Sequence, residues 1–170
     1  MTVEDVAREV GIGKGTIYLH FSGKEELVLA HVDRIAARVL VRLKEIVETS
    51  EPAPRRLRDM LVARVMVRFD SVVHYSQSLS DLLSSVRSAL LVRRASHFEA
   101  EAQLLERAIV EGAAAGELER SDSPATSQVL IVATSSLLPF NLSTRELGRR
   151  ELVLDQATRI ADVLIRGLRR

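Results

Sequence analysis

The sequence predicts an all-α fold, and three observations support this prediction. Apolar residues recur at steps of three and four along most of the chain, as they do on the buried face of a helix. Hydrophobic residues make up 46% of the sequence and aromatic residues only 4%, so the core must be built from aliphatic side chains. The 170 residues include only 8 glycines and 4 prolines, so few positions interrupt a helix. We therefore expect ordered helices packed on helices.

The composition also excludes several classes of protein. The chain has no cysteine, which excludes a disulfide framework and a thiolate metal site. Charged residues follow directly after Met1, unlike a signal peptide, and no apolar run approaches the length of about 20 residues that spans a bilayer. The net charge of +1 is too low for a protein that coats DNA without sequence preference. We expect a cytoplasmic protein with no membrane partner.

Residues 2–27 are the most informative stretch of the chain. Thr2 is placed to cap a first helix, in which Val6 and Val10 share one face. Gly11 suits the left-handed position that ends a helix. A second short helix is expected over residues 13–21, and Ser22 with Glu25 forms a capping box for the next helix. This order of elements is the helix-turn-helix plan.

The second helix of that plan lies in the major groove of DNA, where its N-terminal residues reach base edges. Here those residues are small or polar, and Gly13 and Gly15 let the backbone approach the duplex closely. Lys14 is suited to a guanine edge or a phosphate, and Thr16 to a phosphate or a thymine methyl group. The hydroxyl of Tyr18 and the amine of Lys24 suit phosphate oxygens.

The run VAREVGIGKGTIYLHFSGKEEL strongly resembles the DNA-binding signature of the TetR (tetracycline-repressor) family. The resemblance implies a dimeric, all-helical regulator of transcription that binds a double-stranded DNA operator. It also implies repression that ends when a small-molecule effector enters the C-terminal domain, with no cofactor. The DNA-binding positions that it implies are Thr2, Lys14, Gly15, Thr16, Tyr18, His20 and Lys24. Gly13 departs from the family pattern, which usually has a serine or threonine there.

A further departure concerns the start of the chain. The family has another helix before this motif, whereas the sequence begins at Met1 with the motif already under way. Two hypotheses remain open: the natural protein is longer, which we favour, or its DNA-binding domain is truncated. The second hypothesis gives an alternative function, a TetR-like ligand-binding dimer that has lost DNA binding. We expect a DNA-binding domain over residues 1–21, a connecting helix over 22–50, and a ligand-binding and dimerisation domain over 51–170.

The C-terminal part is expected to form six helices. The apolar spacing predicts them over residues 22–49, 55–74, 80–91, 92–115, 124–138 and 149–168. Gly116 is expected to end the fourth of these helices, and Ser123 followed by Pro124 to start the fifth. Ser143 and Glu146 offer another capping box. In the second helix of the series, the arginines, including Arg64 and Arg68, are expected on solvated faces.

Neither a catalytic cluster nor a paired-histidine metal motif appears in the sequence, so we expect no enzyme and no metal. His97 and Glu101 have the spacing of a metal pair on a helix, but a surface ion pair is the simpler interpretation. Polar and aromatic residues near helix ends are candidates for a ligand pocket: His74, Tyr75, Gln77, His97, Phe98, Phe140 and Asn141. The last two helices are apolar and amphipathic, which by itself fits either a core within the chain or a contact with a partner. The resemblance implies that they form the dimer interface, through Val129, Val132, Ala133, Leu137, Leu152, Ala157, Ile160, Ala161 and Leu164.

Overall fold

A computed structural model describes residues 23–72 and 86–169, and every regular element in these two ranges is a helix, which confirms the predicted all-α class. The elements are α3 (Lys24–Val47), α4 (Ala53–Val72), α6 (Arg87–Ala114), α7 (Ser123–Ser135), the 3₁₀ helix η2 (Pro139–Asn141), α8 (Thr144–Leu147) and α9 (Arg150–Arg166).

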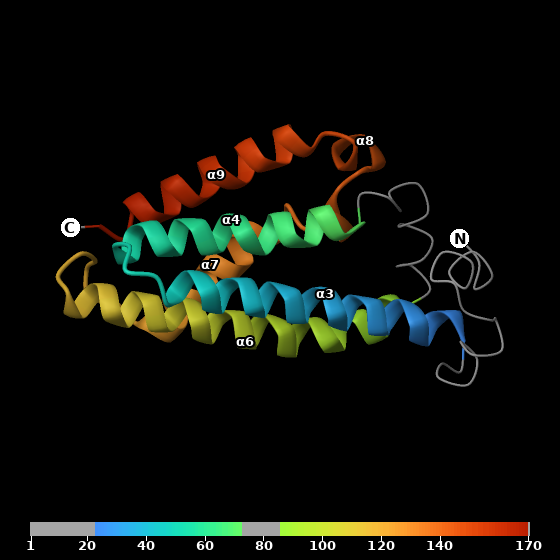
Figure 1. Cartoon of the computed structure of the whole chain (residues 1–170), viewed down its shortest axis with the longest axis horizontal. Coiled ribbons are helices and arrows are strands. Elements are labelled where there is room, and N and C mark those ends of the chain that lie inside the picture. The colour runs from blue at the N-terminus through green and yellow to red at the C-terminus, as the bar shows by residue number, and fades with distance from the viewer. Residues whose placement is uncertain (1–22, 73–85, 170) are drawn as a thin grey trace.

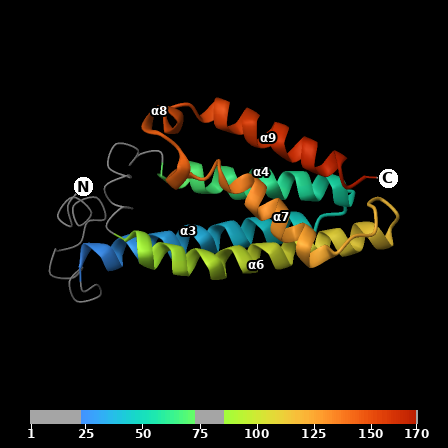
Figure 2. The ribbon, with the colours of Figure 1, turned by 180° about the vertical axis from the view of Figure 1, so that it is seen from behind.

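Helix α4 lies at the centre of the molecule. It packs against α3 and α6 on one side and α9 on the other, and α7 crosses between these layers (Figure 1). The view from behind shows the same arrangement, with α3 and α6 running side by side and α4 beside them (Figure 2). The C-terminal end of α4 lies near the end of the bundle at which α3 begins (Figure 1).

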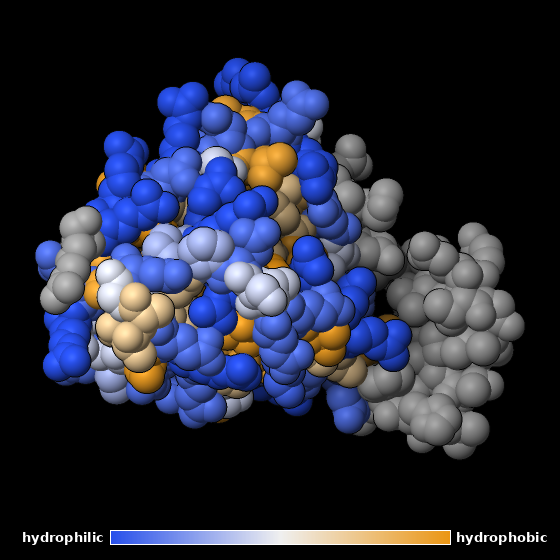
Figure 3. All heavy atoms as spheres, turned by 60° about the vertical axis from the view of Figure 1, so that its left-hand side comes forward, coloured by the Kyte–Doolittle hydropathy of each residue, from blue (hydrophilic) through white to orange (hydrophobic). Residues whose placement is uncertain are grey.

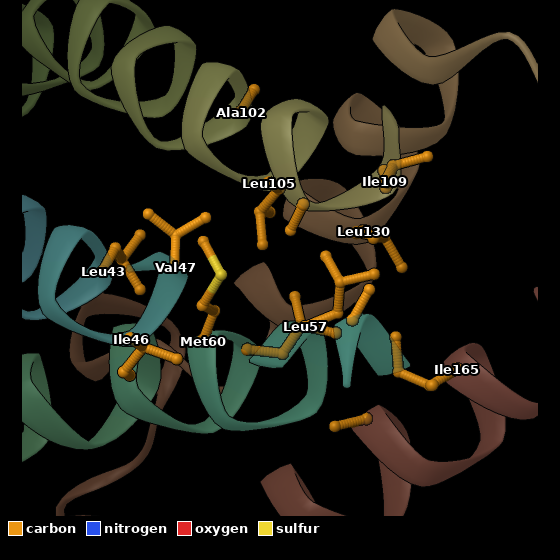
Figure 4. Packing of buried hydrophobic residues seen from close by; sticks show 14 of the residues in the cluster. Leu43, Ile46, Val47, Leu57, Met60, Ala102, Leu105, Ile109, Leu130 and Ile165 are labelled. Atoms are coloured by element: carbon orange, nitrogen blue, oxygen red, sulfur yellow. The ribbon is translucent and has the colours of Figure 1, made fainter. Parts of the chain in front are cut away.

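The main core is aliphatic and lies between α3, α4 and α6, with side chains from α7 and α9 closing it (Figure 4). Leu43 and Val47 of α3 meet Leu57 and Met60 of α4, and Leu105 of α6 completes the contact. All five side chains are almost completely buried. Burial of a side chain of this size is worth about 1.5–3 kcal/mol, so these contacts hold α4 in place.

Helix α6 differs from the prediction, because it is one continuous helix where two were expected. The predicted break at Leu91 and Val92 is wrong, since α6 is already helical at Arg87 and continues to Ala114. No glycine or proline occurs between Arg87 and Glu111, so nothing in the chain interrupts the helix. Val92 is instead an exposed residue of an unbroken helix, with 76% of its surface accessible.

Two of the predicted helix ends are confirmed by the structure, and one is wrong. Gly116 adopts φ +75° directly after α6, the left-handed conformation expected for a terminating glycine. The capping box at α8 is also confirmed, because the Ser143 amide donates to Glu146 Oε2 at 2.8 Å. At α7 the predicted cap Ser123 is wrong: the carboxylate of Asp122 accepts a hydrogen bond from the Ala125 amide at 3.1 Å.

The described surface is polar on the face shown in Figure 3, where charged and polar side chains dominate and apolar side chains form smaller patches between them. None of the helices within residues 23–72 and 86–169 has the length and apolar character needed to cross a bilayer. Both observations suit a bundle that hides its apolar side chains between its helices.

Candidate functional site

The sequence-predicted DNA-binding residues fall almost entirely outside the described part of the chain. Thr2, Lys14, Gly15, Thr16, Tyr18 and His20 precede the first described residue, Gly23. Lys24 is the first residue of α3, which therefore begins directly after the predicted helix-turn-helix. These assignments stay predictions. The described helices form the part of the chain that follows the predicted helix-turn-helix.

Six of the seven predicted pocket residues divide into three groups, and the seventh, His97 of α6, lies beside Asp33 of α3. His74, Tyr75 and Gln77 lie outside the described residues. Phe98 on α6 and Phe140 in η2 are partly buried and contact the same side chain, because the guanidinium carbon of Arg94 is 5.6 Å from the centre of each ring. Asn141 is exposed and donates to the Ser135 carbonyl at 2.8 Å, so it holds the end of α7.

Close to Phe98, α4 and α6 are joined by a buried ion cluster. Arg64 Nε donates to Glu101 Oε2 at 2.8 Å, and Arg68 Nη2 donates to Glu101 Oε1. Arg64 and Glu101 have no exposed surface, and Arg68 is also buried. One carboxylate therefore faces two guanidinium groups, and this buried cluster of Arg64, Arg68 and Glu101 carries a net charge of about +1.

Arg64 is held in place on one side and left without a partner on another. Its Nη1 donates to Thr134 Oγ1 at 2.5 Å and to the Ile131 carbonyl at 3.2 Å, both on α7. Its Nη2 is buried and has no hydrogen-bond partner within residues 23–72 and 86–169. Burial lowers the pKa of the Arg64 guanidinium; the Glu101 carboxylate opposes this shift, and the charge of Arg68 adds to it. This arginine is therefore fixed in position with one donor unused.

Three guanidinium groups surround the Phe98 ring. Their central carbons lie 5.0 Å from the ring centre for Arg64, 5.8 Å for Arg68 and 5.6 Å for Arg94. Each distance is within the range of a cation–π contact. Among the described residues, Arg94 has no hydrogen bond or ion pair that complements its charge, and it is partly exposed. The site thus combines an apolar ring with an excess of positive charge.

The expectation that Arg64 and Arg68 lie on solvated faces is wrong. Both continue the buried stripe of α4, because Leu57, Leu61, Arg64 and Arg68 follow one another at steps of four, three and four. Glu101 occupies the equivalent inward stripe of α6, three residues after Phe98 and four before Leu105. Three charged residues at core positions of two helices were the sequence signal for this cluster.

A second ionic contact joins α6 to α3. Asp33 of α3 accepts from Arg93 Nη1 at 2.5 Å and lies 3.2 Å from His97 Nε2. We call this group of Asp33, Arg93 and His97 the α3–α6 clasp. The predicted His97–Glu101 pair is wrong, because each of the two residues has a different partner. Arg93 and His97 directly precede Arg94 and Phe98, so one stretch of α6 contributes to both sites.

Within residues 23–72 and 86–169, no group of three or more histidine, aspartate or glutamate side chains is placed to hold a metal ion. The side chains that do cluster in this part of the chain are arginines. Arginine donates hydrogen bonds and carries a permanent positive charge, so its natural ligands are carboxylates and phosphates.

The predicted dimer residues differ in their accessibility. Val129 and Val132 on α7 are exposed, at 60% and 70% of their surface, and are available to a partner. Leu137, Ala157 and Ala161 are buried in the core of this chain, and the others are partly buried: Ala133, Leu152, Ile160 and Leu164. Val163 on α9, which the sequence reasoning missed, is 63% exposed. The dimer interface stays a prediction, and the exposed side chains of Val129 and Val132 are its best support.

Comparison with known proteins finds one matching family model and several similar solved structures. The model of the family described as bacterial regulatory proteins, tetR family, matches residues 1–31. The TetR family transcriptional regulator PfmR from Thermus thermophilus has a similar structure, with a TM-score of 0.68 and 17% identity, covering 100% of this chain and 87% of that one. A transcriptional regulator of the TetR/AcrR family from Thermobifida fusca gives a TM-score of 0.62 and 24% identity, covering 100% and 88%. No curated protein matches the sequence.

The two kinds of comparison agree with the residues already described. The sequence match covers the predicted helix-turn-helix and the start of α3, and the structural matches extend over the helical bundle behind it. Residues 1–31 are therefore similar to the tetR family of bacterial regulatory proteins, and the chain shares the fold of two solved TetR-family regulators.

Proposed function

We propose that the protein is a homodimeric, sequence-specific DNA-binding repressor of transcription that a small-molecule effector releases from its operator. The observation that carries this proposal is the family match over residues 1–31, which reaches into α3. Residues 1–21 would bind DNA, residues 22–50 would form the connecting helix, and residues 51–170 would bind the effector and the second protomer.

DNA recognition is assigned to the second helix of the motif. Lys14, Thr16 and His20 would reach into the major groove, with Gly15 allowing close approach of the backbone. Tyr18, Thr2 and Lys24 would contact phosphates, which fix the position of the protein without reading the sequence. In a dimer, two such helices would enter successive major grooves about 34–36 Å apart.

Dimerisation is assigned to α7 and α9. The exposed valines of α7, Val129 and Val132, support it, because large exposed apolar side chains gain the most from a partner surface. Leu152, Ile160 and Leu164 of α9 are partly buried and would lose their remaining exposure in a dimer. A four-helix contact of this kind buries apolar stripes that one chain leaves partly open.

Effector release requires a connection between the ligand site and the DNA-binding segment, and α6 is suited to provide it. Phe98 and Glu101 of α6 contact Arg64 of α4, whereas Arg93 and His97 of α6 contact Asp33 of α3. A ligand that moves α6 would therefore move α3, which leads directly to the motif. It can shift DNA affinity only to the extent that it binds the two arrangements with different affinity.

Fluorescence anisotropy of the full chain with DNA from upstream of its own gene, at two salt concentrations, tests the proposal. Specific binding that weakens steeply with salt is expected, because each phosphate contact releases a counterion. Tyr18→Phe should weaken binding roughly two- to tenfold through loss of one hydrogen bond, and Tyr75→Phe serves as the matched control that should not. Equal affinity for Tyr18→Phe would exclude Tyr18 as a phosphate contact.

If the full chain dimerises but shows no salt-sensitive DNA binding, the repressor proposal fails. The alternative function then applies, a TetR-like dimer that binds a ligand without binding DNA. Gly13, which replaces the usual capping hydroxyl of the recognition helix, is the residue that favours this alternative.

A further inference from the structure

We propose that Arg64, Arg68 and Arg94 bind the carboxylate of an anionic effector, with Phe98 and Phe140 in contact with the apolar body of the same molecule. This inference deepens the proposed function and rests on it in one respect, namely that the bound molecule acts as the effector. The site itself can be tested without DNA.

The balance of charge in the cluster is the first reason to expect an anion. Arg64 and Arg68 share the carboxylate of Glu101, so among the described residues the buried part of the cluster has one uncompensated positive charge. A buried charge without a counter-ion is costly, because the protein interior replaces little of the solvation that water provides. A monoanion would balance this charge, and Arg94 adds a further positive charge beside it.

The unused donor of Arg64 is the second reason. Arg64 Nε and Nη1 both have acceptors at 2.5–3.2 Å, yet Nη2 is buried and has none in the described part of the chain. A carboxylate oxygen at this position would form a charge-assisted hydrogen bond with Nη2. A bound water molecule would satisfy the donor as well, but it would leave the excess charge unbalanced.

The gradient of exposure and the aromatic rings indicate how the rest of the ligand would lie. Exposure increases from Arg64, which is fully buried, through Arg68 to the partly exposed Arg94, so the positive charge extends from the interior to the surface. The guanidinium group of Arg94 contacts both aromatic rings, Phe98 and Phe140. A ligand whose carboxylate reaches Arg64 would have these rings beside it, which favours an aliphatic or aromatic carboxylic acid over a hydrophilic anion.

The test uses two sets of ligands that differ only in their head group. Octanoate, octanol and octylamine form one set, and benzoate, benzyl alcohol and benzylamine form the other. Each is titrated into the full chain at constant ionic strength while thermal unfolding is followed. A carboxylate that binds the native state should raise the Tm, whereas the alcohol and the amine of the same body should leave it unchanged.

Variants assign the binding to the cluster. Arg94→Met should weaken carboxylate binding by at least about tenfold without unfolding the chain, because Arg94 is partly exposed and only contacts two rings. Arg64→Met removes the buried donor and should abolish binding. Arg107→Met, an exposed arginine farther along the same helix, is the control and should bind as wild type does.

Three results would overturn the proposal. In the first, neither carboxylate shifts the Tm, which would mean that a structural water alone satisfies Arg64. In the second, alcohols stabilise the chain as much as carboxylates do, so charge is not recognised. In the third, Arg94→Met binds as tightly as Arg107→Met.

The same carboxylates are then added to the complex with DNA to separate this inference from the proposed function. Release of DNA supports both. Carboxylate binding without release leaves the site standing and contradicts ligand-controlled repression. If the chain binds DNA but binds none of the carboxylates, the proposed carboxylate site is wrong and the proposed function is not affected.

Discussion

The contact between α4 and α6 has two halves of opposite chemistry. In one half, Leu57 and Met60 pack against Leu105 with no exposed surface and no polar atom to satisfy. In the other half, two turns farther along α4, Arg64 and Arg68 close on Glu101. Both halves are buried, and among the described residues each leaves one arginine donor without a hydrogen-bond partner, Arg56 Nε at the apolar end and Arg64 Nη2 at the charged end. They differ in charge, because Arg56 has its own carboxylate in Glu111 whereas Arg64 and Arg68 share Glu101.

The positions of the two halves explain this difference. The charged half lies toward the end of the bundle at which α3 begins, next to the α3–α6 clasp (Figure 1). The apolar half lies toward the opposite end, where α4 starts and α6 finishes. We infer that the apolar half provides stability, whereas the charged half retains unsatisfied groups for a ligand near the helix that leads to DNA. An unsatisfied buried group costs stability, and such a cost is typical of functional sites.

Replacing Glu101 should have the largest effect on stability. Glu101→Leu leaves two buried guanidinium groups without a carboxylate, and we expect a loss of about 3–5 kcal/mol in the free energy of unfolding. Urea denaturation followed by circular dichroism measures this loss. Glu99→Gln, an exposed residue two positions earlier on α6, is the control and should change stability by less than about 0.5 kcal/mol.

A triple variant tests whether the charged half costs stability, because it makes both halves of the α4–α6 contact apolar. In the variant Arg64→Met, Arg68→Met, Glu101→Leu, all three charges are replaced by apolar side chains of similar size. Stability should return to near the wild-type value or exceed it, because apolar packing avoids the desolvation of charge. A triple variant as unstable as Glu101→Leu alone would contradict the view that the charged half costs stability.

The apolar half should tolerate no added volume at Gly112 of α6. A Cβ at Gly112 would lie 2.6 Å from Ala53 Cβ and 2.7 Å from Leu118 Cδ1. Gly112→Ala should therefore destabilise the chain by about 1–3 kcal/mol, measured by urea denaturation. Gly167→Ala is the matched control, because its nearest contact would be an ordinary 3.4 Å. Equal stability of the two variants would show that this end of the core is not tightly packed.

The α3–α6 clasp should contribute little to the free energy of unfolding and more to the effect that a bound ligand has on DNA affinity. Asp33 is close to half exposed, so Asp33→Asn should cost less than about 1 kcal/mol. We expect it to reduce by severalfold the effect of a bound carboxylate on DNA affinity, which anisotropy measures. Glu45→Gln, which weakens an ion pair confined to α3, should leave that effect intact. Full coupling in Asp33→Asn would remove the clasp from the mechanism.

The smallest effect concerns His31 on α3. Burial, followed by the charges of Arg38 and Arg34, lowers the pKa of His31 below its ordinary value of 6.5. The folded chain therefore binds this proton less readily than the unfolded chain, so stability falls as the pH decreases below 6.5. The loss should stay under about 1 kcal/mol because the side chain is only partly buried and water screens its charge. His31→Gln should reduce this pH dependence of the urea midpoint, and an unchanged dependence would assign it elsewhere.

The helices were largely predictable from the sequence because their signals are local. The spacing of apolar residues located α3, α4 and α9, and Gly116 marked the end of α6. The break predicted near Leu91 failed because apolar runs were read as separate helices although no glycine or proline divides them.

The candidate site was less predictable, since it depends on contacts between distant parts of the chain. Phe98 and Phe140 were named from composition, but Arg64 and Arg68, which lie beside the Phe98 ring, were assigned to solvated faces. The partnership of Arg64 with Glu101, 37 positions away, depends on how α4 packs against α6. Charged residues on the apolar stripes of both helices were the available clue, and only the packing shows that they meet.

The most direct test of the arginine cluster as the effector site is DNA release by octanoate, followed by anisotropy of the operator complex and compared between wild type and Arg94→Met. We expect octanoate to lower the DNA affinity of the wild-type protein. Arg94→Met should bind the same DNA with the same affinity but need at least about tenfold more octanoate for release. Release of both proteins at the same concentration, or of neither, would contradict the claim that the arginine cluster recognises the effector.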